Sequence, residues 1–226
     1  MLKTFLLLLV VVVAGVLGFA ATRPGTYRVE RAVSIEAPAP VVFAQLDDFR
    51  AWKAWSPWEG KDPQMNRTYE GPARGVGATY AWQGNSKVGE GKMTISDSQS
   101  PVALRLSLEL IKPFASVAAT TFAISPDGAG SVTVKWAIEG NNNLMAKLFG
   151  LVVNKDTLIG GDFEKGLASL KQVAEAEATR QAAVALAAAA QAASAAAGEK
   201  ARVEAAAALV AATKEPPPRA KAKKKH

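Results

Sequence analysis

Residues 156–173 read DTLIGGDFEKGLASLKQV, and this stretch decides the predicted fold. Its apolar residues recur at steps of three and four, with charged residues between them. These apolar residues are Leu158, Ile159, Phe163, Leu167, Leu170 and Val173. The spacing gives an α-helix with one apolar face, and such a face must be buried against another surface. The rest of the chain is therefore expected to supply an apolar surface for this helix.

The segments before this helix have the pattern of β-strands. Residues 26–35 read TYRVERAVSI, in which apolar and polar residues alternate and only Arg31 interrupts the apolar face. Glycines punctuate the chain from residue 67 onward, and Pro126-Asp127-Gly128 reads as a hairpin turn. The regular spacing indicates one meandering antiparallel sheet. Its further strands are expected at residues 67–69, 78–83, 90–96, 103–110, 116–125 and 131–139.

Three shorter segments complete the pattern. Pro38 and Pro40 end the first strand, and a short amphipathic helix is expected over residues 41–49. Three tryptophans within residues 52–58 are interleaved with proline and polar residues, which indicates a loop with turns. A second short helix is expected at residues 144–152.

Several short phrases in the chain are typical of one known family. They are IEAP at 35–38 with VVF at 41–43, the tryptophan segment 52–59, GP and GVGA within 71–78, YAWQGN and VGEG within 80–91, and GDFEKGL at 161–167. Together with the order of elements, these phrases resemble the START-like (SRPBCC) superfamily, and within it the polyketide cyclase/dehydrase-like family. The resemblance extends over about residues 28–174, and none of the phrases is a catalytic motif.

The resemblance implies an α+β helix-grip fold. In this fold a curved antiparallel sheet, here of about six or seven strands, wraps around a long C-terminal helix. A cavity between sheet and helix would hold hydrophobic or amphipathic ligands such as lipids, polyketides or sterols. The domain is expected at residues 23–175, and the fold does not specify a reaction.

The N-terminal segment, residues 1–22, addresses the chain to a membrane. An uncharged and mostly apolar run follows Lys3 and continues to Ala21, which is near the minimum length for crossing a bilayer. It is expected to be a retained anchor that leaves the domain outside the cytoplasm, in the periplasm. The alternative is a signal peptide cleaved after Ala20, with a secreted product.

The C-terminal segment, residues 176–226, is rich in alanine and ends in a basic tip. Alanine favours a helix through residues 181–197, Gly198 is expected to break or bend it, and residues 199–213 to resume it. Ten Lys or Arg against five Asp or Glu lie from residue 171 onward, so the basic charge belongs to the tail. The tip, with Pro216–Pro218 and its lysines, would be attracted to an anionic surface. The membrane-addressed N-terminus disfavours nucleic acid as its partner.

The composition excludes several kinds of chemistry. The chain has no cysteine, which excludes thiolate catalysis, disulfides and cysteine-ligated metals. Its one histidine, His226, is the last residue, so a histidine base or a histidine-rich metal site is not expected. The sequence predicts neither a metal nor a cofactor, and it favours a binding module over an enzyme.

Aromatic and apolar residues are the candidates for a ligand cavity. The three loop tryptophans would either line its mouth or cap the core. The strand residues and Phe163 would be core and cavity lining at once. The candidates are Trp52, Trp55, Trp58, Tyr80, Trp82, Met93, Phe122, Trp136 and Phe163.

Glu90 is the candidate for acid–base chemistry, because a carboxylate facing an apolar cavity would have a raised pKa. Strand periodicity places Glu90 on the face opposite Met93, so only a bulge at Gly89 and Gly91 would turn it inward. The sequence therefore predicts membrane-associated binding of a lipid-like or polyketide-like small molecule. One alternative is a cyclase- or hydratase-type enzyme that uses a cavity carboxylate with Tyr80. The other is a scaffold that acts through its basic tail.

Overall fold

The structure is a computed structural model that describes residues 2–128 and 130–214. Its helices are α1 (Leu2–Ala21), α2 (Ala39–Leu46), the 3-10 helix η1 (Ala51–Ala54), α3 (Leu144–Phe149) and α4 (Lys155–Lys214). Its strands are β1 (Thr26–Ile35), β2 (Asn66–Glu70), β3 (Thr79–Gln83), β4 (Glu90–Gln99), β5 (Ala103–Lys112), β6 (Ser116–Pro126) and β7 (Val132–Asn141). Residues up to Ala178 form one compact unit, and residues from Thr179 form a second.

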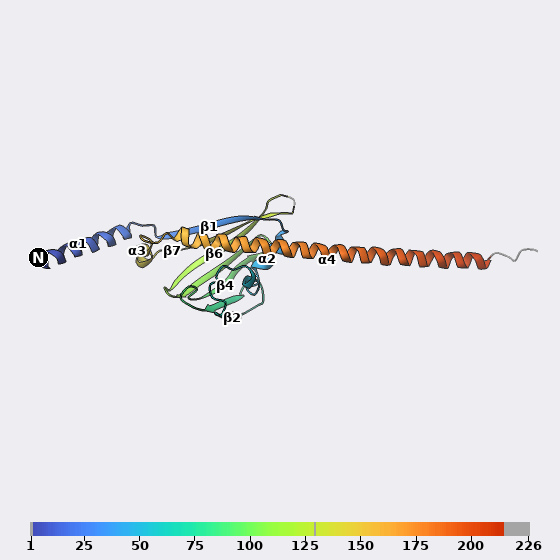
Figure 1. The fold of residues 1–226 in the computed structure, drawn as a ribbon, viewed down its shortest axis with the longest axis horizontal. Helices are drawn as coiled ribbons and strands as arrows, with labels where there is room; N and C mark the ends of the chain where they lie inside the picture. The colour runs from blue at the N-terminus through green and yellow to red at the C-terminus, as the bar shows by residue number, and fades with distance from the viewer. Residues whose placement is uncertain (1, 129, 215–226) are drawn as a thin grey trace, which may run out of the picture. The chain divides into compact units, whose positions relative to one another are not determined.

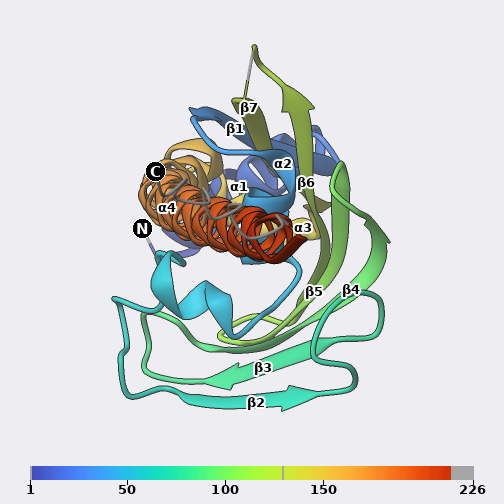
Figure 2. The same cartoon turned by 90° about the vertical axis from the view of Figure 1, so that its right-hand side faces the viewer.

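The seven strands form a single antiparallel sheet in the order β1-β7-β6-β5-β4-β3-β2 (Figure 1). Strands β2 to β7 follow one another as a meander, and β1 joins the edge by pairing with β7. Figure 2 shows the sheet curving, and its concave face covers the part of α4 that belongs to the first unit. The α+β helix-grip architecture expected from the sequence is confirmed.

The apolar face of α4 fills the concave side of the sheet. Phe163, Leu167, Leu170 and Ala174 are buried there, in the same cluster as the inward residues of the strands. Burying a side chain of this size contributes about 1.5–3 kcal/mol. The predicted amphipathic stretch 156–173 is thus the part of α4 that closes the domain.

Arg31, which interrupts the apolar face of β1, ties this edge strand to α4. Its guanidinium lies 3.0 Å from the Asp156 carboxylate and 2.7 Å from the Glu164 carboxylate. Hydrogen bonds to these two carboxylates raise the pKa of Arg31 and lower that of Asp156. The break in the strand pattern is therefore a contact between sheet and helix.

In the second unit the described residues continue α4 as an alanine-rich helix to Lys214, and its side chains are exposed over residues 179–210. The expected break at Gly198 is wrong, because α4 passes through this residue without interruption. One glycine costs about 1 kcal/mol relative to alanine in a helix, and the surrounding alanines have the highest helix propensity. The predicted Pro216–Pro218 segment, the lysine tip and His226 lie outside the described residues.

Helix α1 is the one described helix that is long and apolar enough to cross a membrane, with a mean hydropathy of 2.8. Almost all of its side chains are exposed. Length and composition fit an anchor or a signal sequence equally.

Candidate functional site

A cavity of about 400 Å³ lies between the concave face of the sheet and the first turns of α4. Strands β3 to β7, the loop after η1 and α4 all contribute to its wall. Among the predicted residues, those that line it are Trp52, Trp58, Tyr80, Trp82, Met93, Trp136 and Phe163. A broader depression of about 580 Å³ lies on the outer face, beside Arg28 and Ser107, but it is open to solvent and cannot enclose a small molecule.

Trp55 and Phe122, also predicted for the cavity, lie behind its wall rather than on it. Both are buried, and their rings meet edge to face with centroids 6.1 Å apart. Trp55 donates from Nε1 to the Gln45 carbonyl oxygen over 3.0 Å, and Trp52 donates likewise to Leu46 over 2.9 Å. The two indoles therefore attach the loop to the end of α2, and the tryptophan segment both caps the core and lines the cavity.

Trp136 is the centre of the aromatic wall. Its ring stacks on Phe163 with centroids 4.0 Å apart and on Phe122 at 4.9 Å, while Trp58 meets it edge to face at 5.7 Å. The side chain is 2% exposed, and its Nε1 has no hydrogen-bond partner among the residues that the structure describes. A buried donor without an acceptor costs about 1–3 kcal/mol. Trp136 therefore combines an unsatisfied buried N–H with a place in the cavity lining.

The polar groups of the cavity lie near Trp136 and at the opening. Thr120 is buried and lines the cavity, one diagonal position from Trp136 on the neighbouring strand. The Lys61 ammonium pairs with the Asp162 carboxylate over 2.5 Å, and both side chains line the cavity. These three residues were not predicted from the sequence. Thr120 lies two residues before Phe122 on the same strand, so alternation predicts that it faces inward. Asp162 lies four residues after Leu158, so helical spacing predicts that it lies on the apolar side of α4.

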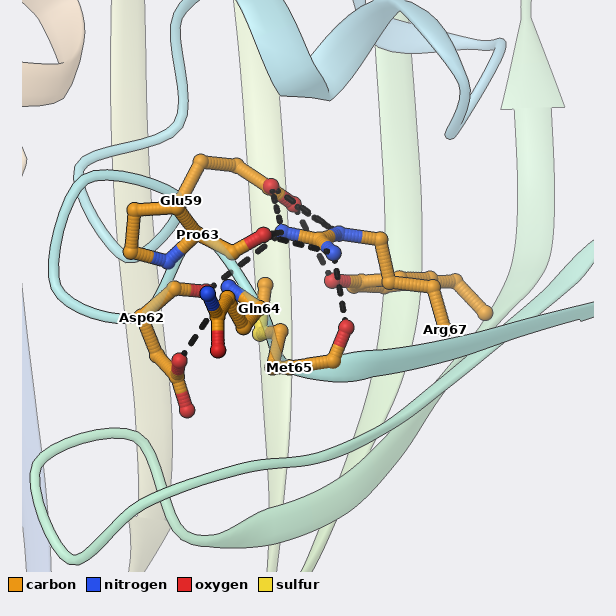
Figure 3. Close-up of polar contacts among 7 residues, drawn as sticks. Glu59, Asp62, Pro63, Gln64, Met65 and Arg67 are labelled. Carbon is orange, nitrogen blue, oxygen red and sulfur yellow. Dashed lines mark hydrogen bonds and ion pairs between the residues drawn. The ribbon is translucent and has the colours of Figure 1, made fainter.

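A nearly buried ion pair holds the loop after the tryptophans in place (Figure 3). Arg67 of β2 contacts Glu59 at 2.5 Å, with side chains 17% and 10% exposed, and also donates to the Met65 carbonyl oxygen over 2.7 Å. Tyr80 donates to Glu59 over 3.2 Å. Burial, and secondly the charge of Glu59, raise the pKa of Tyr80. Asp62 accepts from the Asn85 backbone N–H over 2.7 Å and so fixes the β3–β4 turn.

Glu90 does not line the cavity, although the strand register does shift between Glu90 and Gly91. Its carboxylate lies 2.7 Å from the Lys112 ammonium, and Gln83 donates to it over 3.3 Å. The hydrogen bond to Lys112 lowers the pKa of Glu90 below its ordinary value, whereas a carboxylate turned into the cavity would have a raised pKa. In this environment the carboxylate is ionised at neutral pH and is not a proton donor.

The described residues contain no cluster of three or more His, Cys, Asp or Glu side chains that could hold a metal ion. Asp162 is the one carboxylate among the described residues that line the cavity. The site can therefore surround an apolar molecule, and Lys61, Lys87 and Asp162 can meet a polar group of that molecule.

The comparisons with known proteins agree with the fold. The chain resembles the solution structure of the KanY protein, with 16% identity, a TM-score of 0.51, and coverage of 67% of this chain and 99% of that one. It also resembles a protein from Thermobifida fusca, with 20% identity, a TM-score of 0.48, and coverage of 65% and 92%. No curated protein matches the chain. At 16% identity the likeness to the KanY protein shows the fold alone.

The family model described as "Polyketide cyclase / dehydrase and lipid transport" matches residues 26–175, which include every strand and the cavity-lining part of α4. A match of this extent covers more than half of the chain. The protein therefore belongs to the polyketide cyclase/dehydrase and lipid transport family.

Proposed function

We propose that the domain binds a hydrophobic or amphipathic small molecule, lipid-like or polyketide-like, in the cavity between sheet and α4. The observation that carries this proposal is a cavity of about 400 Å³ with an aromatic wall and a buried Trp136 N–H that lacks an acceptor among the described residues. Pockets of about 300–1,000 Å³ with apolar walls and a few convergent polar groups are typical ligand sites.

The polar groups narrow the class of ligand. An oxygen acceptor on an otherwise apolar body would satisfy Trp136 Nε1, and Thr120 beside it offers a hydroxyl. Lys61 and Lys87 line the opening and would suit an acidic or strongly polar head group. The expected ligand is therefore a molecule with an apolar body, at least one carbonyl or hydroxyl oxygen, and a polar end.

Helix α1 would keep this binding domain at a membrane. Its 20 residues, uncharged after Lys3, are compatible with a retained anchor that leaves the domain outside the cytoplasm, and the cleaved form would be secreted. Residues 1–22, 23–175 and 176–226 would then be anchor, binding domain and tail. The basic tail would contact an anionic surface, and a scaffold role for it is an independent alternative.

The binding proposal is tested by native mass spectrometry of the full chain released from detergent, with long-chain fatty acids and aromatic polyketides offered as ligands. Leu108→Trp would fill the cavity, since Leu108 lines it. Ser107→Trp is the matched control, because the neighbouring residue on β5 points to the outer face. We expect ligand-bound masses for the native chain and Ser107→Trp, and their loss in Leu108→Trp.

Equal binding by Leu108→Trp and the native chain would contradict the proposal, because the ligand would then lie elsewhere. Turnover of a bound compound would instead favour the enzyme alternative. In that case Asp162 would be the carboxylate to replace, as it is the one that lines the cavity.

A further inference from the structure

Helix α1 joins the domain at one particular end of the sheet. At this end β1 begins, and Thr26 pairs with Asn141 at the end of β7. The Asn142 backbone N–H donates to the Gly25 carbonyl oxygen over 2.8 Å. The Lys147 ammonium of α3 donates to the carbonyl oxygen of Ala21, the last residue of α1, over 3.1 Å. Figure 1 shows α3 at this junction.

The strand register brings two hairpin turns to the same end. Leu110 pairs with Ser116 across the β5–β6 turn, and Gln83 pairs with Glu90 across the β3–β4 turn. Antiparallel pairing from β7 through β3 places both turns beside the end of β7. The turns at residues 71–78 and 100–102 lie at the opposite end of the sheet.

The cavity opens at the end that carries α1. Its lining includes residues 86–89 of the β3–β4 turn, Lys112 and Pro113 of the β5–β6 turn, and Leu158 and Ile159 of the first turns of α4. These segments surround the entrance, so a ligand that enters or leaves passes between them.

Exposed apolar side chains lie on the turn and helix segments at this same end of the domain. Phe114 at the tip of the β5–β6 turn is 72% exposed, Met145 on α3 is 68% exposed, and Val152 is 88% exposed. We call these residues, together with their exposed neighbours, the mouth rim. Large apolar side chains that gather in water mark a contact surface. The mouth rim consists of Phe114, Leu144, Met145, Phe149, Val152 and Leu158.

Cations accompany the mouth rim. Arg23, Lys87, Lys147 and Lys155 lie at this end of the domain, and none pairs with a carboxylate within residues 2–128 and 130–214. Lys112 lies there too, paired with Glu90. Exposed apolar side chains among cations that have no carboxylate partner are the composition that binds the interface of an anionic bilayer.

We infer that the mouth rim docks on the bilayer in which α1 is anchored, so that the cavity exchanges its ligand directly with the membrane. Four residues separate α1 from β1, which limits the gap to about 14 Å when fully extended. A ten-residue strand such as β4 is about 33 Å long, so the opposite end of the sheet stays well outside the interface. The inference depends on the proposed function for its ligand, but the membrane contact is measurable without one.

The absence of cysteine from the chain allows a direct test with single labels. In the full chain reconstituted into vesicles of phosphatidylcholine and phosphatidylglycerol, Phe114→Cys or Met145→Cys carries an environment-sensitive NBD fluorophore. Val102→Cys is the matched control, since Val102 is an equally apolar, exposed turn residue at the opposite end. We expect lipid-borne nitroxide to quench the two mouth-rim labels, and aqueous iodide to quench the control label.

Iodide quenching of the mouth-rim labels to the level of the Val102 label would overturn the inference. A second measurement addresses exchange: Phe114→Ser with Met145→Ser should slow ligand transfer from vesicles by about tenfold or more. Its affinity for the same ligand in detergent should stay unchanged. Normal transfer by this variant would also overturn the inference. Absence of any ligand binding, with the labels still in the bilayer, would contradict the proposed function alone.

Discussion

The ion pair between Glu59 and Arg67 gives the sharpest prediction about how the cavity wall is held. Arg67→Met keeps the length of the side chain but leaves the Glu59 carboxylate, 10% exposed, with the Tyr80 hydroxyl as its main neighbour. Removing one partner of a buried ion pair costs about 3–5 kcal/mol. Because both groups retain some solvent contact, we expect about 3 kcal/mol, the lower end of that range. A loss of this size is a large part of the 5–15 kcal/mol typical of a domain.

The assay is urea unfolding of the full chain in detergent, followed by tryptophan fluorescence. All five tryptophans lie between residues 52 and 136, so the signal reports on the domain and not on α1 or the tail. The double variant Glu59→Gln with Arg67→Met removes both charges and should be less destabilised than Arg67→Met alone. Lys92→Met is the control, because it breaks an exposed pair with Glu109 inside the domain and should cost less than about 0.5 kcal/mol.

Two results would refute this reasoning about the cavity wall. One is a loss below about 1 kcal/mol for Arg67→Met, the value of an exposed pair. The other is a double variant no more stable than Arg67→Met, which would mean that the unpaired Glu59 carboxylate does not cause the loss of stability.

Three further predictions concern Trp136, the glycines of α4 and acid stability. Trp136→Phe should leave the free energy of unfolding within about 1 kcal/mol of the native value, because it removes an unsatisfied N–H. The same variant should bind an oxygen-bearing ligand about fivefold more weakly in mass-spectrometric titration. Gly166→Ala should lower the melting temperature, since the added methyl would lie 2.8 Å from the Trp136 ring, whereas Gly161→Ala, with open space around it, should gain about 1 kcal/mol. The opposite order would be inconsistent with the packing of α4. The hydrogen bond to Arg31 lowers the pKa of Asp156 in the folded protein. The ionised carboxylate therefore stabilises the folded state above the pKa of about 3.9 that it has in the unfolded chain. This contribution is lost as the pH falls through the lower pKa of the folded state. Arg31→Gln should therefore flatten the acid limb of a stability–pH curve, and an unchanged limb would exclude this contact as its cause.

Much of the fold could be predicted because its signals are local and periodic. The alternation in residues 26–35 and the three- and four-residue steps in 156–173 identify a strand and a helix from neighbouring residues alone. The sheet order follows from short turns between successive strands. Gly198 misled the prediction because helix propensity is a sum over a window, and one unfavourable residue among alanines does not end a helix.

The candidate site was predictable to the extent that strand parity and aromatic content decide which residues face inward. Strand alternation places Phe122 on the concave face. It does not predict that the rings of Trp52 and Trp55 pack against Phe122 and separate it from the cavity. The pairing of Lys61 with Asp162 joins residues about a hundred positions apart and depends on where the loop meets α4. The partner of Glu90 likewise depends on register with β5, where Lys112 lies opposite. Such contacts are set by tertiary packing, for which no local pattern exists.

Photocrosslinking with a diazirine-bearing long-chain fatty acid tests the central claim most directly, namely that an apolar ligand occupies the cavity between sheet and α4. The full chain in vesicles is irradiated with the probe, and the modified residues are located by peptide mass spectrometry. We predict adducts on inward residues such as Trp82, Met93, Leu108 and Trp136, which line the cavity, and their loss in Leu108→Trp. Adducts confined to α1 and the outer face of the sheet, unchanged by Leu108→Trp, would contradict the account.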